Sequence, residues 1–225
     1  MTDINTIAEL GTAVGTLFLG VATLASVRSA NRAARVAERS LLVGLRPVLT
    51  PSRPEDPDQK IIYGDGRSFK VRSGTGVVEE IDGVIYLAIP LRNVGAGLAV
   101  LQKYDLITES PLHEARTPYS GKARQERHYG PIENFRTLQR DLYIASGDVG
   151  YWQAALRDDS DDLHAGLRAA ISDEREPISV DLLYGDHEGG QFEVSRFNLV
   201  PREDHWFCTV VFHWSVGGSD PRLLD

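Results

Sequence analysis

The sequence predicts a mainly β protein, namely an antiparallel β-sandwich of the immunoglobulin-like type with one crossover helix, preceded by a long N-terminal helix. Three observations predict it. An uncharged stretch lies near the N-terminus, about ten short segments with strand-like patterns follow, and only one later segment has helical periodicity. The 225 residues are 42% hydrophobic and 25% charged, which is typical of a folded protein. We expect two domains, residues 1–46 and residues 47–225.

The N-terminal helix has the pattern of a membrane anchor. Residues 10–27 carry no charge, and a helix from residue 7 to residue 27 spans roughly the 30 Å of a bilayer core. Two acidic residues precede the stretch, and four arginines flank its other end: Arg28, Arg32, Arg35 and Arg39. Basic flanks stay on the cytoplasmic side. We therefore expect a single-pass helix through the lipid bilayer, with the N-terminus outside and the remainder in the cytoplasm.

The composition of this stretch leaves an alternative open. Only eight of its 18 residues are Leu, Val or Phe, so a buried helix of a soluble protein has a similar pattern. The arginines fit a stop-transfer cluster, and they also fit an attraction to anionic lipid headgroups.

Small residues form a stripe along the same helix, which we expect to run from about residue 5 to residue 45. They recur at alternating steps of three and four, a heptad spacing. Small residues let helix backbones approach closely in a bilayer. This stripe therefore predicts a homo-oligomer, with packing of the helix against the protein's own domain as the alternative. Its members are Ala13, Thr16, Gly20, Thr23, Val27, Ala30, Ala34, Ala37, Leu41 and Gly44.

Strand-like segments dominate the chain after residue 60. Several alternate apolar and polar residues, as half-buried antiparallel strands do, and residues 192–200 (FEVSRFNLV) are an example. One helix interrupts them, with Ser160 as its predicted N-cap and Leu163, Leu167 and Ile171 on one face. Residues 93–97 (NVGAG) predict a turn in which Asn and Gly adopt positive φ angles.

Two connections differ in character. Residues 184–191 (YGDHEGGQ) predict a tight hairpin turn between two strands. Residues 109–136 form a long polar segment rich in His, Arg and Glu, and such a length predicts a disordered loop or a mobile flap.

Charge and cysteine content exclude some partners and scaffolds. Residues 1–46 hold five basic and three acidic residues, so residues 47–225 hold 19 basic and 29 acidic ones, a net charge of −10. Phosphate binding needs a basic surface, so nucleic acid is not an expected partner. We expect a neutral or basic cytoplasmic protein instead. The single cysteine, Cys208, cannot form an intrachain disulfide, and its strand-like surroundings predict a core position.

The sequence contains few candidates for chemistry. It has no nucleophile elbow, phosphate-binding glycine loop, HExxH or CxxC motif, and we predict no cofactor and no catalytic residue. The ligand-binding candidates are Asp186, His187 and Glu188 on the hairpin turn, together with His128 in the long loop. Consecutive side chains on a tight turn point apart, so we predict no metal site there.

Histidine and tryptophan pairs mark the last strand. His205 and His213 are eight residues apart and are expected on one face of the strand, with Trp206 and Trp214 on the other. Packing is the expected role of both pairs.

Two motifs give the chain a resemblance. RNVGAGLAVL at residues 92–101 and VDLLYGDHEGGQ at residues 180–191 resemble segments of a group of uncharacterised actinobacterial proteins. That group has an N-terminal membrane helix before a cytoplasmic sandwich domain. The resemblance implies a location in the bacterial inner (plasma) membrane, and it implies no particular activity.

Two functions follow from these observations. The first is a membrane-anchored, non-enzymatic protein-interaction module that faces the cytoplasm. The alternative is a small-ligand sensor or an enzyme, with a site between the loop at residues 109–136 and the turn at residues 186–188.

Overall fold

The structure is a computed structural model, and it describes residues 4–108, 131–172 and 176–216. For residues 4–13, 39, 43 and 141 it describes the backbone alone. The chain divides into two compact units, Met1–Gly44 and Leu45–Asp225, and each is described by itself. We call the second unit the β domain.

The first unit is a single helix, α1 (Ile4–Leu45). No proline interrupts the helix. It ends shortly before Pro47, because proline disfavours helical geometry in the residue before it. The predicted helix from about residue 5 to residue 45 is confirmed. Within the described part of the chain, no helix combines the length and the apolar character that crossing a bilayer requires.

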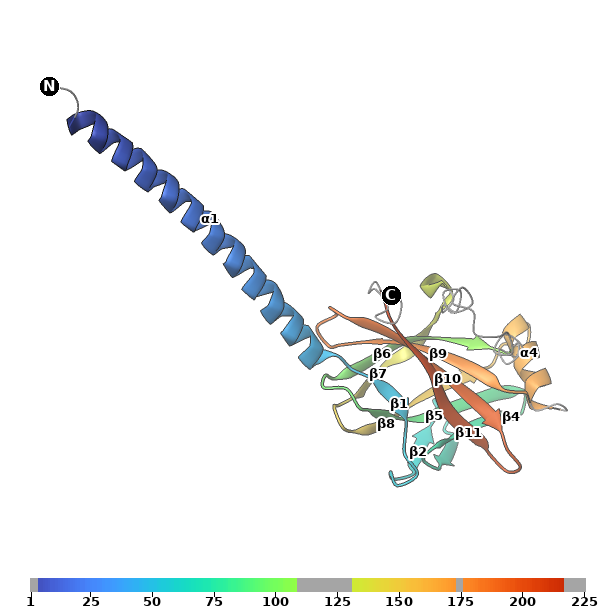
Figure 1. The fold of residues 1–225 in the computed structure, drawn as a ribbon. Coiled ribbons are helices and arrows are strands. Elements are labelled where there is room, and N and C mark those ends of the chain that lie inside the picture. The colour runs from blue at the N-terminus through green and yellow to red at the C-terminus, as the bar shows by residue number, and fades with distance from the viewer. Residues whose placement is uncertain (1–3, 109–130, 173–175, 217–225) are drawn as a thin grey trace, which may run out of the picture. The chain divides into compact units, whose positions relative to one another are not determined.

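The β domain is built mainly from antiparallel strands (Figure 1). In chain order they are β1 (Leu49–Pro51), β2 (Gln59–Ile62), β3 (Ser68–Val71), β4 (Thr75–Ile81), β5 (Val84–Asn93), β6 (Ala99–Ile107), β7 (Arg136–Ile144), β8 (Val149–Leu156), β9 (Ile178–Gly185), β10 (Phe192–Pro201) and β11 (Trp206–Ser215).

Nine of these strands form one curled sheet. Its order is β1-β5-β4-β11-β10-β9-β6-β7, and β8 pairs with β5. The sheet curls until β7 and β8 lie side by side, although no pairing joins these two strands in the described structure. We call this junction the seam. A mainly β fold with antiparallel strands is therefore confirmed, and the prediction of an immunoglobulin-like sandwich is not.

The main core fills the inside of the curl. It takes Leu87 and Ile89 from β5, Trp152 from β8, Leu182 from β9 and Phe197 from β10, all of them fully buried. A fully buried side chain of this kind contributes about 1.5–3 kcal/mol through the hydrophobic effect. The seam therefore closes over a packed interior.

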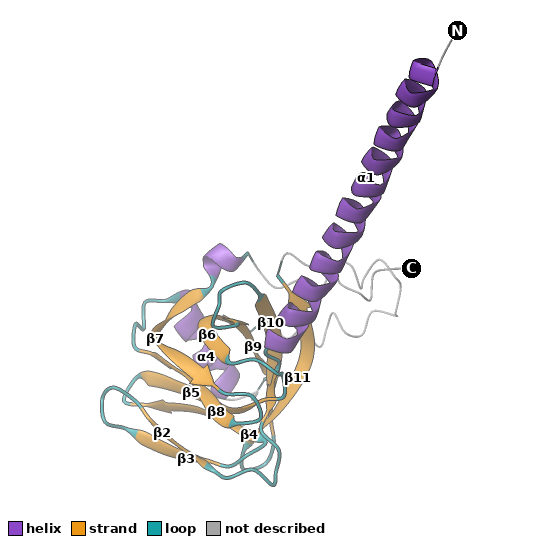
Figure 2. Ribbon diagram, turned by 90° about the vertical axis from the view of Figure 1, so that its left-hand side faces the viewer, coloured by secondary structure: helices purple, strands orange, loops and turns teal. Residues whose placement is uncertain are grey.

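Strand β5 is buried on both faces. Its outer face carries Tyr86 and Ala88, which pack with Ile61 and Val71 of the β2–β3 hairpin. This hairpin lies beside β8 and β4 (Figure 2). Coverage on both sides explains why the sequence of β5, VIYLAIPLRN, is a nearly continuous apolar run rather than an alternating one.

A β-bulge changes the faces of β11. Arg196 pairs with Phe212 but Phe197 pairs with Val210, so Val211 is an extra residue. An extra residue reverses the alternation of side chains beyond it. Trp206 consequently joins the main core, whereas Trp214 packs on the opposite face of the sheet. The expectation that the two tryptophans share a face is wrong.

The helix between β8 and β9 is α4 (Asp162–Ile171). Its N-cap is Asp161, whose carboxylate accepts a hydrogen bond from the backbone N–H of Leu163 at 3.0 Å. The prediction of Ser160 as the cap is wrong, because the Ser160 hydroxyl donates to Asp158 instead. Leu167 lies in the main core and Leu163 and Ile171 pack against it, as predicted.

The glycines of residues 93–97 have another role than expected. Neither Gly95 nor Gly97 has a positive φ. A Cβ on Gly97 would lie 1.8 Å from the carbonyl oxygen of Leu45, and one on Gly95 would lie 2.4 Å from that of Arg46. These glycines are required because another backbone segment packs directly against them.

The end of the long polar segment is ordered. Ile132–Asn134 form a short 3-10 helix, η1, and Phe135 is buried. Arg136 already belongs to β7. The disorder or mobility predicted for 109–136 is therefore wrong for residues 131–136, and residues 109–130 lie outside the described residues.

Candidate functional site

The predicted ligand residues lie on the turn between β9 and β10. The Asp186 carboxylate is buried and accepts hydrogen bonds from the backbone N–H of Gly190 at 2.9 Å and from the side chain of Gln191 at 3.2 Å. His187 and Glu188 are exposed, and His187 Nε2 lies 3.4 Å from Glu188 Oε1. Asp186 therefore holds the turn together. His128 lies outside the described residues, so a site shared with this turn stays a prediction.

The single thiol is deeply buried. Cys208 lies in the main core, and burial raises the pKa of its thiol well above the usual range. A protonated, inaccessible thiol is a poor nucleophile. The described side chains contain no group of three or more His, Cys, Asp or Glu residues that could hold a metal ion.

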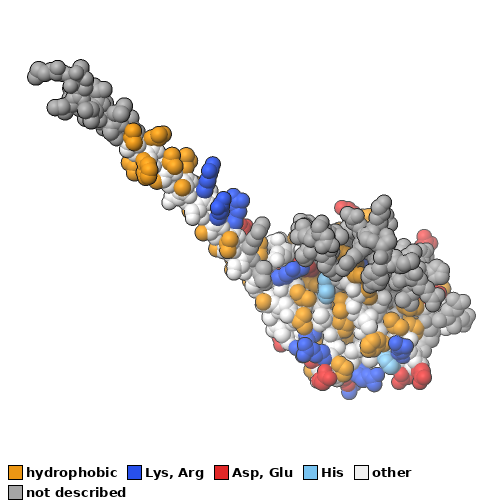
Figure 3. Space-filling model, viewed as in Figure 1, with side chains coloured by type: hydrophobic (Ala, Val, Ile, Leu, Met, Phe, Trp, Pro, Cys, Tyr) orange, Lys and Arg blue, Asp and Glu red, His pale blue; other side chains and the backbone are white. Residues whose placement is uncertain are grey.

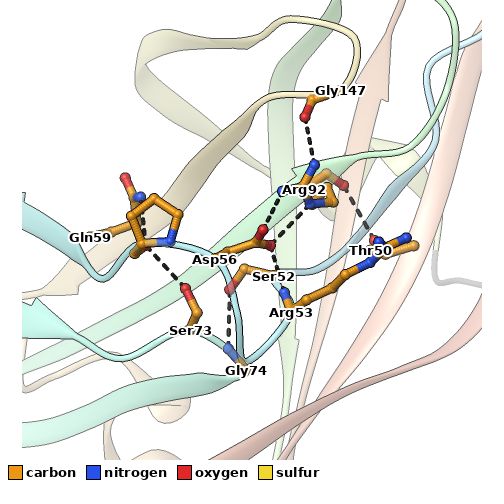
Figure 4. Close-up of polar contacts among 10 residues, drawn as sticks. Thr50, Ser52, Arg53, Asp56, Gln59, Ser73, Gly74, Arg92 and Gly147 are labelled. Carbon is orange, nitrogen blue, oxygen red and sulfur yellow. Dashed lines mark hydrogen bonds and ion pairs between the residues drawn. The ribbon is translucent and has the colours of Figure 1, made fainter.

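A partly buried ion pair fixes the loop between β1 and β2 (Figure 4). Arg92 on β5 makes a two-point contact with the Asp56 carboxylate, and its other nitrogen donates to the Gly147 carbonyl at 2.6 Å. The backbone N–H of Arg53 also donates to Asp56, at 2.7 Å. These donors lower the pKa of Asp56, with the Arg92 hydrogen bond as the largest cause. The pair is a structural tie.

Two further ion pairs between an arginine and a carboxylate also tie separate segments of the chain together. Arg196 makes a bidentate pair with Asp181 at 2.7 Å, and the Asp181 side chain is fully buried. Glu193 is 3% exposed and pairs with Arg46 at 2.9 Å. Burial raises the pKa of Glu193, although Arg46 opposes that shift. The Arg196–Asp181 pair joins directly opposite residues of β10 and β9, and the Arg46–Glu193 pair joins β10 to the segment before β1.

A short hydrogen-bonded chain lies beside Glu193. The backbone N–H of Leu49 donates to the Tyr184 hydroxyl, which lies 2.7 Å from Ser195 Oγ, and Ser195 Oγ lies 2.6 Å from His213 Nδ1. Burial raises the pKa of Tyr184 to about 12. Ser195 is fully buried, so this chain orders the interior and presents no nucleophile to solvent.

Helix α1 exposes a large apolar surface. Seven Leu, Val and Phe side chains between residues 14 and 27 are each more than half exposed. Figure 3 shows these side chains gathered along α1, followed by a group of basic ones. Of the flanking arginines, Arg28, Arg32 and Arg35 are exposed, and the side chain of Arg39 is not described. Pairing of two copies of the chain through the stripe of small residues on α1 stays a prediction.

The β domain contains a polar pocket at the seam. Between Leu101 and Lys103 of β6, the partner residue on β7 moves from Leu142 to Thr137. Two steps on β6 thus correspond to five on β7, so β7 has a bulge of three extra residues. This bulge faces β8 across a cavity of about 280 Å³. Bulges of this kind commonly re-aim side chains next to binding sites.

The lining of this pocket is mixed in character. Leu138, Leu142 and Ala154 provide apolar surface, while Arg140 and Gln153 provide polar groups. The side-chain oxygen of Gln153 is buried and has no hydrogen-bond partner among the described residues. Such a group costs about 1–3 kcal/mol when nothing satisfies it.

The cation of the pocket is also poorly compensated. Arg140 is exposed, and its nearest polar partner is the Tyr151 hydroxyl at 3.4 Å. No carboxylate among the described side chains lies within ion-pair distance of it. Arg157, at the same pocket, pairs with Asp65 at 2.8 Å. Among the described side chains that line the pocket, Arg140 is the cation without a carboxylate partner.

Sequence reasoning did not find these residues. The pocket residues of β7 and those of β8 belong to separate strands with ordinary polar patterns, and only the curl of the sheet brings them together; they include Gln139, Arg140, Leu142 and Gln153–Ala155. The one available signal was the break in alternation in RTLQRDLYI of β7.

Comparisons of this chain with protein-family models, with curated proteins and with solved structures found no match.

Proposed function

We propose that α1 anchors this protein in a lipid bilayer, and that the β domain is a non-enzymatic module that binds a cytoplasmic protein. The exposure of the apolar side chains of α1 between Val14 and Val27 carries this proposal. An apolar surface made of seven exposed side chains is unfavourable in water, and lipid tails can cover it. Residues 10–13, which begin the uncharged stretch, lie outside the described side chains and extend it towards the N-terminus.

The charges beside the apolar surface support an orientation. Arginines follow it at helical spacing, and acidic residues precede it. Each basic residue near an anionic inner leaflet contributes about 1 kcal/mol. This arrangement favours an N-terminus outside and a β domain inside the cell.

The arrangement of charges in the β domain supports a binding role. Its carboxylates Asp56, Asp181 and Glu193 are each paired with an arginine from a separate segment of the chain. Residues 47–225 carry a net charge of −10. An acidic surface is repelled by the inner leaflet and is attracted to neutral or basic protein surfaces.

An alkaline carbonate wash of membranes tests the anchor. We expect the full chain to stay in the membrane pellet, because carbonate removes proteins held by charge alone. The double variant L17D/V21D places two carboxylates in the apolar stretch, each of which costs about 2.5–3.5 kcal/mol at the centre of a bilayer. This variant should therefore move to the supernatant.

The control is the variant S29D/N31D, which adds the same charges beyond the stretch. It should remain in the pellet. Recovery of the unmodified full chain in the supernatant would contradict the proposal.

A further inference from the structure

We propose that Arg28 and Arg32 of α1 together bind the headgroup phosphate of one anionic phospholipid, whose acyl chains lie along the apolar side chains on the same face of the helix. This inference rests on the proposed anchoring of α1 in a bilayer, and it adds a specific lipid partner. Three features carry it: the spacing of the two arginines, their lack of a carboxylate partner and their position next to an apolar stripe.

The spacing brings the two guanidinium groups together. Arg28 and Arg32 are four residues apart in a continuous α-helix, and both side chains are exposed. Side chains at positions i and i+4 are neighbours on a helix surface, with their Cβ atoms about 5–6 Å apart. Two guanidinium groups at this separation can donate hydrogen bonds to the same phosphate.

Neither arginine is neutralised within the described part of the chain. Every ion pair between described side chains lies in the β domain, and Arg28 and Arg32 have no further polar or charged contact. Two like charges at this spacing destabilise a helix. An anion bound between the two groups removes their repulsion, so the pair favours a ligand with a net negative charge.

The depth of the pair matches the headgroup layer of a bilayer. The uncharged stretch of α1 ends at Val27. In an upright helix, Arg28 and Arg32 therefore lie about 1.5 and 7.5 Å beyond the end of this stretch. The headgroup layer on each side of a bilayer is about 5–7 Å thick, so both guanidinium groups can reach phosphates there. Arg35, about 12 Å beyond the stretch, lies outside this layer.

The helix face that carries the arginines continues as an apolar stripe. Four side chains precede Arg28 at alternating steps of three and four residues, and each is at least 60% exposed: Val14, Leu17, Val21 and Leu24. Such steps keep side chains on one face of a helix. In Figure 3 the apolar side chains of α1 are followed by the basic ones. A lipid with its phosphate at the two arginines can therefore cover this stripe with its acyl chains.

The chemistry of the pair selects among phospholipids. The phosphate of phosphatidylcholine is accompanied by a quaternary ammonium group, which neighbouring arginines repel. Phosphatidylglycerol has the same phosphate and a neutral glycerol group instead. Each basic residue near an anionic lipid surface favours binding by a factor of about five. The site should therefore prefer phosphatidylglycerol to phosphatidylcholine.

The lipids that the full chain retains test the proposal. The chain is reconstituted in vesicles of phosphatidylcholine and phosphatidylglycerol, and the lipids that stay bound after transfer to detergent are identified by mass spectrometry. We expect the ratio of phosphatidylglycerol to phosphatidylcholine among them to exceed that of the vesicles at least about fivefold.

Two variants connect this enrichment to the pair. Arg32→Gln removes one guanidinium group and should lower the enrichment about fivefold. The double variant A30R/R32A keeps the charge and nearly the depth, but it moves the guanidinium group to the opposite side of the helix, away from Arg28. It should lower the enrichment as much as Arg32→Gln does.

Arg35→Gln is the matched control, because it removes an exposed arginine of the same face that lies beyond the headgroup layer. Screening by salt should limit its effect on the enrichment to less than about twofold. Thermal melting of each variant, with a transition like that of the unmodified chain, establishes that the β domain is folded.

The inference is overturned if Arg32→Gln keeps the full enrichment, or if A30R/R32A retains as much phosphatidylglycerol as the unmodified chain. A chain that resists the carbonate wash but shows no enrichment overturns this inference and leaves the anchor intact. Release of the unmodified chain by the carbonate wash would contradict the anchor, and this inference with it.

Discussion

Individual charged residues of the β domain act in pairs that join distant segments. Asp56 is the clearest case, because it lies in the loop before β2 and receives donors from Arg92 of β5 and from the backbone of Arg53. The sequence around Asp56 (PSRPEDPDQ) predicts only a loop, since proline and aspartate both disfavour regular structure. Its partner could not be predicted, because 36 residues separate Asp56 from Arg92.

The first prediction concerns the pH dependence of this pair. Hydrogen bonds lower the pKa of Asp56 below its ordinary value of 3.8 in the folded state. The pair therefore contributes full stability above about pH 4, and the contribution is lost as the pH falls through the folded-state pKa. Asp56→Asn should lower the melting temperature by about 5 °C at pH 7.

Thermal melting of both proteins between pH 7 and pH 3 checks this expectation. The difference in melting temperature should stay constant down to about pH 5 and shrink below pH 4. Glu55→Gln, which changes a neighbouring exposed carboxylate, is the matched control. A difference for Asp56→Asn that grows on acidification would contradict the assigned role.

Whole elements were predicted well where a local pattern determines them and poorly where contacts between strands do. The helix α1 and the position of β9 follow from apolar runs and from proline positions. The bulge at Val211 could not be predicted, because a single extra residue leaves no mark in an apolar strand such as WFCTVVFHWS. For the same reason the sequence did not indicate the seam pocket, which depends on the bulge of β7.

The turn between β5 and β6 provides a test at the level of elements. Its glycines allow the segment that leads into β1 to pack directly on the turn, and a Cβ on Gly97 would overlap the Leu45 carbonyl. Gly97→Ala should therefore destabilise the β domain by about 1–3 kcal/mol. Urea unfolding of the full chain measures the change.

The matched control is Gly64→Ala, because a Cβ at that position meets nothing within 4 Å. It should change the free energy of unfolding by less than about 0.5 kcal/mol. Equal stabilities of the two variants would show that the close approach at Gly97 is not needed.

The whole molecule joins a helix that has an exposed apolar stretch to an acidic β domain. In the described part of α1, apolar side chains come first and arginines follow, whereas the β domain buries its apolar residues inside a curled sheet. This division is readable in the sequence, because uncharged and charged residues are separated along the chain. The partner of the β domain is not readable in the same way, since surface recognition depends on which strands the fold brings together.

The accessibility of single cysteines in intact cells tests the proposed orientation most directly. Native Cys208 is buried and does not interfere with labelling of the folded protein. The account predicts that a membrane-impermeant maleimide labels Asn5→Cys in intact cells and labels Asp159→Cys, an exposed position of the β domain, only after lysis. Labelling of Asp159→Cys in intact cells, or of Asn5→Cys only after lysis, would contradict it.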